Sequence, residues 1–223
     1  MMVTGSLRHN GNNPKLSSSP IEEDVDDSGV RIVPGPRSYS DVTKLGEECI
    51  IFSSSITQRI KRRNLDETFA GGNVSFRRFP GAKARHIKDY TETTLKESAP
   101  KFAIIQSGGN DLPTPRYNPV PVADIANEII ETGLLCRRYG VQHIFISSVP
   151  LRRQFYQQQR CRDLNAFLRD LCVVHNFIFI DNANISVEHL FTDGVHLTDQ
   201  GSQILCDNYL LYLNSIFDDI FST

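Results

Sequence analysis

Three short groups of residues carry side chains suited to acyl-transfer chemistry. They are Ser53-Ser54-Ser55, Gly108-Gly109-Asn110-Asp111 and Asp193-Gly194-Val195-His196. Acyl transfer requires a nucleophile, a base, a group that orients the base, and donors that face the developing oxyanion. Ser55 is the candidate nucleophile and His196 the candidate base, with Asp193 as the carboxylate that would hold the imidazole tautomer.

The same chemistry requires hydrogen-bond donors for an oxyanion. The candidates are the backbone N–H groups of Ser55 and Gly81 and the side-chain amide of Asn110. Neither a metal ion nor an organic cofactor is required, because the side chains supply both the base and the electrophilic stabilisation. We therefore expect a site without a cofactor.

Secondary structure must bring these groups together, and the apolar pattern predicts how. Short β-branched and aromatic runs predict five strands. Segments between and after them have apolar residues at helical spacing, near residues 82–96, 125–134, 160–173 and 200–217. Strands separated by helices imply right-handed crossovers and a parallel sheet covered on both faces. The predicted strands are Ile50–Phe52, Val74–Phe79, Phe102–Ile105, Ile144–Ile146 and Phe177–Ile180.

In such a sheet, sites lie at the carboxyl ends of the strands, and each polar group follows a predicted strand. The spacing of Ile56 and Ile60 predicts a helix directly after the first strand. Ser55 would then lie at its N-terminus, where backbone amides favour negative charge. A serine at this place is also a common helix cap. Convergence of all the groups on one rim favours a reactive site over a cap.

Composition predicts one globular domain, residues 46–223, after a disordered tail, residues 1–45. The chain has 223 residues, of which 39% are hydrophobic and 22% charged, as in ordinary globular proteins. The tail contains Ser17-Ser18-Ser19-Pro20 and an acidic cluster at 22–27, too polar to compensate the entropy of ordering. A net charge of −2 gives no overall electrostatic case for nucleic acid or an anionic membrane.

The expected location is intracellular, in the cytoplasm. No apolar run approaches the roughly 20 residues that span a bilayer, and the first residues lack a signal-peptide core. Five cysteines without regular spacing indicate reduced thiols. No feature of the sequence specifies an oligomeric state.

Four blocks resemble those of the SGNH (GDSL-type) hydrolase family, over residue 48 to the end. The resemblance implies a flavodoxin-like three-layer α/β/α sandwich with a mostly parallel five-stranded sheet. It also implies hydrolysis of a small ester or acetyl group by Ser55, Gly81, Asn110 and His196, with Asp193 as the partner of the histidine. The overall layout is similar to esterase-type domains of some non-LTR retrotransposon proteins and their stand-alone animal relatives. The blocks are Ile51–Thr57, Phe79-Pro80-Gly81, Gly108–Leu112 and Asp193–Leu197.

The first block departs from the family, which usually has Gly-Asp-Ser where this chain has Ser53-Ser54-Ser55. Ser53 adds a side chain where the backbone would need close packing or an unusual dihedral. Ser54 removes a carboxylate that would anchor the loop. These changes leave two alternatives open: an esterase, with activity intact or reduced, and a catalytically silent binding module for nucleic acid or a protein partner. Anion or phosphoester binding at the start of the helix is a third.

A basic cluster bears on the binding alternative. If its basic residues lie on one face of the protein, they could bind the phosphates of nucleic acid or an anionic head group. A solvated helix face is the simpler interpretation. No aromatic residues interleave with it to stack single-stranded bases. Nearer the site, His189 has apolar flanks and is expected to be structural, and Asp111 is expected to anchor its loop through backbone hydrogen bonds. The cluster comprises Arg59, Lys61, Arg62, Arg63, Arg77, Arg78, Lys83, Arg85 and Lys88.

Overall fold

The first strand, β1 (Cys49–Ser53), is buried along its whole length. The computed structural model describes residues 48–221 except 62–64, 66–67, 70–71 and 113–118, so the predicted tail lies outside the described residues. Ile50 and Phe52 contact one hydrophobic core, and Cys49 and Ile51 contact a second core on the other face. Burial on both faces explains why this strand is apolar throughout instead of alternating.

Five strands form one sheet in the order β2-β1-β3-β4-β5, and every neighbouring pair is parallel. The predicted parallel five-stranded sheet is therefore confirmed. β1 lies between β2 and β3, which places the ends of these three strands side by side. The other strands are β2 (Val74–Arg78), β3 (Phe102–Gln106), β4 (His143–Ser147) and β5 (Ile178–Ile180).

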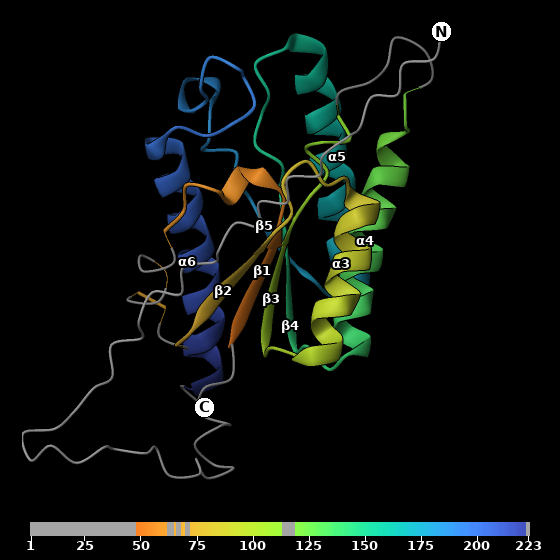
Figure 1. Ribbon diagram of the computed structural model, residues 1–223, viewed down its shortest axis with the longest axis vertical. Helices are drawn as coiled ribbons and strands as arrows, with labels where there is room; N and C mark the ends of the chain where they lie inside the picture. Colours follow the sequence, from red (N-terminus) through yellow and green to blue (C-terminus); the bar gives the residue numbers. More distant parts are fainter. Residues whose placement is uncertain (1–47, 62–64, 66–67, 70–71, 113–118, 222–223) are drawn as a thin grey trace, which may run out of the picture.

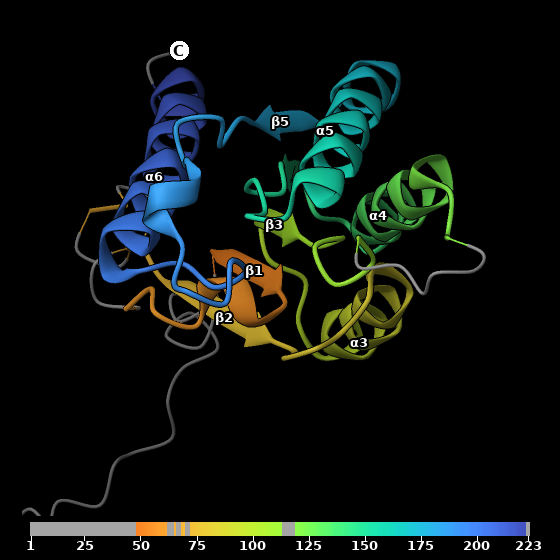
Figure 2. The ribbon, with the colours of Figure 1, turned by 90° about the horizontal axis from the view of Figure 1, so that it is seen from above.

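Helices cover both faces of the sheet (Figure 1). Seen from above, α3, α4 and α5 lie on one side and α6 lies on the other (Figure 2). Ile87, Ile129 and Leu164 bring the first three helices into the core with Ile50, whereas Tyr209 brings α6 into the core with Ile51. The predicted three-layer α/β/α sandwich is confirmed. The helices are α3 (Ala84–Glu97), α4 (Val122–Arg138), α5 (Phe155–His175) and α6 (Asp199–Phe221).

The helix expected after β1 is only a short 3-10 turn, η1 (Ser55–Thr57). Ile56 and Ile60 are buried as their spacing implied. Arg78 donates from Nη2 to the Ile60 carbonyl at 2.8 Å, beyond the end of this turn. The expected effect of a helix N-terminus on Ser55 is therefore wrong, because three residues add few aligned peptide dipoles.

No helix among the described residues is long and apolar enough to cross a membrane.

Candidate active site

The strand order brings the first three predicted blocks to neighbouring positions on one rim. Ser55 follows β1, Gly81 follows β2 and Asn110 follows β3. Because β1 lies between the other two strands, Ser55 lies between the loops that carry Gly81 and Asn110. Parallel sheets place ligand sites at this rim, beyond the carboxyl ends of the strands.

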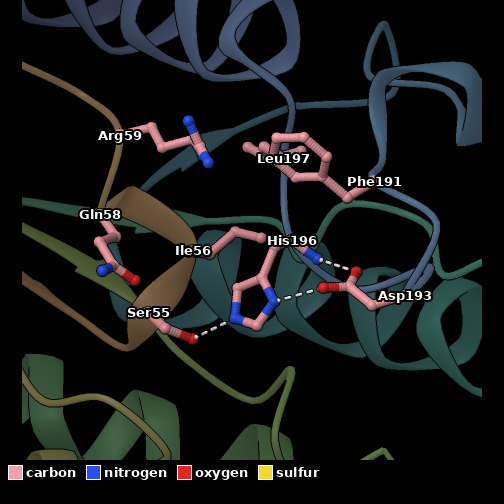
Figure 3. A pocket seen from close by; sticks show the side chains of 8 residues that line it. All are labelled: Ser55, Ile56, Gln58, Arg59, Phe191, Asp193, His196 and Leu197. Carbon is pink, nitrogen blue, oxygen red and sulfur yellow. Dashed lines mark hydrogen bonds and ion pairs between the residues drawn. The ribbon is translucent and has the colours of Figure 1, made fainter.

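Ser55, His196 and Asp193 form a continuous chain of hydrogen bonds (Figure 3). The Ser55 Oγ lies 3.1 Å from His196 Nε2, and His196 Nδ1 lies 2.9 Å from Asp193 Oδ2. A carboxylate only accepts hydrogen bonds, so Nδ1 carries the proton and Nε2 is left to accept from the Ser55 hydroxyl. This tautomer makes His196 a base directed at Ser55.

Asp193 remains a carboxylate to low pH because donors surround it. Its Oδ1 accepts from the backbone N–H of His196 at 2.9 Å and of Val195 at 2.8 Å. The backbone N–H of His196, the imidazole of His196 and the N–H of Val195, in that order, lower the pKa of Asp193 to about 2. Hydrogen bonds to the charged form of an acid have this effect.

The loop carrying Asp193 and His196 closes on itself just before α6. The Phe191 N–H donates to the His196 carbonyl at 2.9 Å, and the Gly194 N–H donates to the Phe191 carbonyl at 2.9 Å. Gly194 has φ +69°, and a Cβ there would lie 2.5 Å from the Cβ of Arg153. The turn therefore requires glycine.

Ser53 does not have the backbone conformation expected from its place in the first block. It ends β1, and Asn176 is the one non-glycine residue with positive φ among the described residues. The buried Ser53 Oγ lies 2.6 Å from the Thr57 Oγ1, which is also buried. Ser53 thus links β1 to η1 by its side chain.

The Asn110 side chain bonds to the residue that follows Gly81 and not to Ser55. Asn110 donates from Nδ2 to the Ala82 carbonyl at 2.9 Å, and Gly81 has φ +76°. Asp111 Oδ2 accepts from the Ala84 N–H at 3.0 Å, which confirms the expected loop anchor. Burial raises the pKa of Asp111. Among the described residues, no hydrogen bond joins Gly81 or Asn110 to Ser55 or His196.

Ser55 and His196 line a pocket of about 460 Å³ (Figure 3). One wall carries side chains that no sequence motif assigned to the site. Arg59 lies 4.6 Å from the ring centre of Phe191 and donates to Asp199 at 2.9 Å. The one sequence feature that could have indicated Arg59 and Phe191 is that they lie within a few residues of Ser55 and His196. The lining residues are Ser55, Ile56, Gln58, Arg59, Phe191, Asp193, His196 and Leu197.

His189 has a local structural role, as expected. Its Nδ1 accepts from the Ser186 N–H at 3.1 Å, and its carbonyl accepts from Thr198. It is absent from the residues lining the pocket. The nearby histidine that contacts the candidate nucleophile is His196.

Members of the basic cluster have separate intramolecular partners. Arg59 pairs with Asp199, Arg78 lies 3.9 Å above the ring centre of Phe76, and Lys88 pairs with Glu128 at 2.8 Å. Arg62 and Arg63 lie outside the described residues. Among the described residues, no three His, Cys, Asp or Glu side chains are grouped to hold a metal ion.

Comparisons with known proteins show the fold of this chain. No family model and no curated sequence matches it. A GDSL-like lipase from Bacteroides thetaiotaomicron has TM-score 0.63 and 17% identity, covering 76% of this chain and 89% of that one. An acetylxylan esterase from Geobacillus stearothermophilus has TM-score 0.63 and 17% identity, covering 75% and 94%. A lipase/acylhydrolase from Enterococcus faecalis has TM-score 0.61 and 18% identity, covering 75% and 95%.

The chain therefore has the fold of the SGNH (GDSL-type) hydrolases. Its similarity to the esterase-type domains of retrotransposon proteins stays a prediction.

Proposed function

We propose that this protein is a serine esterase that hydrolyses a small ester or acetyl group. The observation that carries the proposal is the Ser55–His196–Asp193 chain of hydrogen bonds, at 3.1 and 2.9 Å. Ser55 and His196 are 141 residues apart in sequence, so the tertiary fold alone brings them into contact. The esterases and acylhydrolases that share this fold support the same reaction class.

The reaction begins when His196 Nε2 accepts the proton of Ser55 as Oγ attacks the ester carbonyl. The negative charge moves to the carbonyl oxygen, and Asp193 stabilises the imidazolium that has formed. The N–H groups of Ser55 and Gly81 and the Asn110 amide stabilise the oxyanion. The intermediate collapses with proton transfer from His196 to the leaving alcohol. Water then attacks the acyl-serine with His196 again as the base, releasing the acid.

The Asn110 amide has a second proton for this task. An asparagine NH2 group donates twice, and Ala82 accepts one hydrogen bond from it. The other proton is available for substrate. The bond to Ala82 would hold the amide in place beforehand, which reduces reorganisation during the reaction.

The test is hydrolysis of a short-chain chromogenic ester by the wild type and the Ser55→Ala and His196→Ala variants. Removing either side chain is expected to lower kcat by at least about 10³-fold, as for other nucleophile–base pairs. Ser54→Ala and His189→Asn are the matched controls. Each changes a serine or a histidine close to the site that is not part of the Ser55–His196–Asp193 chain of hydrogen bonds. Circular dichroism establishes that all variants are folded.

Equal rates for the wild type and both site variants across a panel of acyl chain lengths would reject the esterase function. The silent binding module would then be favoured, and salt-dependent binding of RNA or DNA would identify its nucleic-acid form.

A further inference from the structure

Arg152 is a buried arginine beside the loop that carries the base. It follows β4 on the rim of the site and is 5% exposed. Its Nη1 donates to the Val195 carbonyl at 3.0 Å. Its Nε has no hydrogen-bond partner among the described residues. Burying a charged group without all of its hydrogen-bond partners costs free energy of folding. A contribution to solubility or to apolar packing therefore does not explain an arginine at this position.

The same guanidinium lies against the loop of the candidate oxyanion asparagine. A Cβ added to Gly109 would overlap Arg152 Nη2. Gly109 has no positive φ, so its backbone conformation does not require glycine. A side chain at this position would have to displace the Arg152 guanidinium.

Arg152 thus touches the backbone of two separate loops of the site. Gly109 directly precedes Asn110, and Val195 lies between Asp193 and His196. Burial lowers the pKa of Arg152, and electrostatic interactions with Cys161 and then with the negative charge of Asp193 oppose that effect. The charge of Asp193 thus favours a cation at this position.

The neighbouring Arg153 holds the outer side of the loop. Its backbone N–H donates to the Gly194 carbonyl at 3.1 Å, and its Nη2 donates to the carbonyls of Val187 and Leu190 at 3.3 Å. The two successive arginines therefore contact different parts of the loop. Only Arg152 also reaches Gly109.

We propose that Arg152 is a positioning residue that sets the separation between the His196 loop and the Asn110 loop. The inference rests on the proposed esterase function. It assigns Arg152 an effect on kcat, because the base and the oxyanion donors must be aligned together in the transition state. Arg152 does not line the substrate pocket, so KM is expected to change little.

The first experiment measures kcat and KM for Arg152→Met and Arg152→Lys. Displacements of about 1 Å cost up to roughly 100-fold, so Arg152→Met is expected to lower kcat about 10- to 100-fold. Arg152→Lys restores part of that loss because it keeps the charge. Arg137→Met is the matched control: Arg137 donates to the carbonyls of His175 and Asn176 at the end of α5, away from this rim. Its kcat is expected to equal that of the wild type.

A double-mutant cycle tests the contact with Gly109. Gly109→Ala displaces Arg152 and is expected to lower kcat in the wild-type background. In the Arg152→Met background it is expected to have little further effect, because the group it displaces is gone. The proposal would be overturned if the loss of kcat in the double variant equalled the product of the losses in the two single variants. An unchanged kcat for Arg152→Met would overturn it as well.

Hydrogen exchange gives a measurement that does not depend on turnover. The N–H groups of Val195 and His196 are bonded to Asp193, so their exchange reports the order of the loop. Arg152→Met and Gly109→Ala are each expected to accelerate exchange in residues 193–197, whereas Arg137→Met is not. Unchanged exchange in a folded Arg152→Met variant would overturn the positioning role. A wild type without esterase activity but with this exchange pattern would reject the esterase function alone.

Discussion

At the scale of single residues, the unusual first block is accommodated by one added hydrogen bond. Ser53 stands where the family usually has glycine, and its buried hydroxyl pairs with Thr57 at 2.6 Å. Two hydroxyls can each donate and accept, so the pair satisfies groups that would otherwise be costly to bury. Ser53 therefore fits into β1 without an unusual backbone conformation. The substitution is compatible with the Ser55–His196 contact.

Removal of one member of this pair should destabilise the protein more than removal of both. Thr57→Val leaves the Ser53 hydroxyl buried without its partner, at an expected cost of about 1–3 kcal/mol in the free energy of unfolding. The double variant Ser53→Ala/Thr57→Val should be closer to the wild type. Urea unfolding measures both, and a double variant that is the less stable of the two would contradict this explanation.

The pKa of Asp193 gives a second prediction at this scale. A pKa of about 2 lies below the usual value of ~3.9 for aspartate, so the folded state favours the carboxylate. The contribution of the Asp193 carboxylate to the free energy of unfolding is fully present above the usual pKa of aspartate and is lost as the pH falls towards 2. In ¹³C NMR the carboxyl should titrate near 2, and His196→Ala should raise this midpoint by removing the imidazole donor. A midpoint near that of a free aspartate in the wild type would be the opposing result.

At the scale of elements, a loop after β3 holds the beginning of α3. The Asp111 carboxylate accepts from the N–H of Ala84, the first residue of that helix. The first N–H groups of a helix have no partner within it. The same loop holds Ala82 through Asn110, so Gly81 and Asn110 are supported by one set of contacts.

Asp111→Ala should therefore loosen the start of α3. The expected loss in the free energy of unfolding is about 1–2 kcal/mol, as for other helix caps. Amide exchange should accelerate in residues 81–87. Asp111→Asn keeps an acceptor oxygen and serves as the control with a smaller loss. Equal losses in the two variants would show that the hydrogen bond to Ala84 is not the cause.

At the scale of the whole molecule, a polar network centred on the buried Asn182 and Asn208 joins α6 to the sheet. Asn208 donates to Asn182 and Asn184, both at 2.9 Å, and Asn182 in turn donates to Ser147 at the end of β4. Such a network is favourable only while every member has its partners. It ties the second helical layer to the rim where the candidate site lies.

Asn208→Ala should be costly because it leaves the buried amide oxygen of Asn182 without its donor. We expect a loss of about 1–3 kcal/mol in the free energy of unfolding. Leu211→Ala, which alters an exposed residue of the same helix, should stay within about 0.5 kcal/mol of the wild type. Thermal and urea unfolding measure both variants. Similar stability for the two would remove the network as a main link between the layers.

Local patterns were sufficient to predict the sheet and the rim. Burial on both faces requires continuous apolar strands, and tight turns after them require small or polar residues, so both leave short-range signals in the sequence. For this reason the strand β1 and the helices of the sandwich were predicted correctly. The anchor role of Asp111 was predicted for the same reason.

Contacts between distant segments were decided by the tertiary structure alone. The apolar spacing of Ile56 and Ile60 indicated burial, but it did not indicate that the Ile60 carbonyl accepts a hydrogen bond from Arg78. The pairing of Arg59 with Asp199 and the reach of Arg152 to Val195 join residues far apart in sequence. A long polar side chain can reach many hydrogen-bond partners, and the spacing of apolar residues in the sequence does not indicate which partner it takes. The sequence by itself therefore determined the sheet and the candidate chemistry, whereas packing between loops decided which side chains support it.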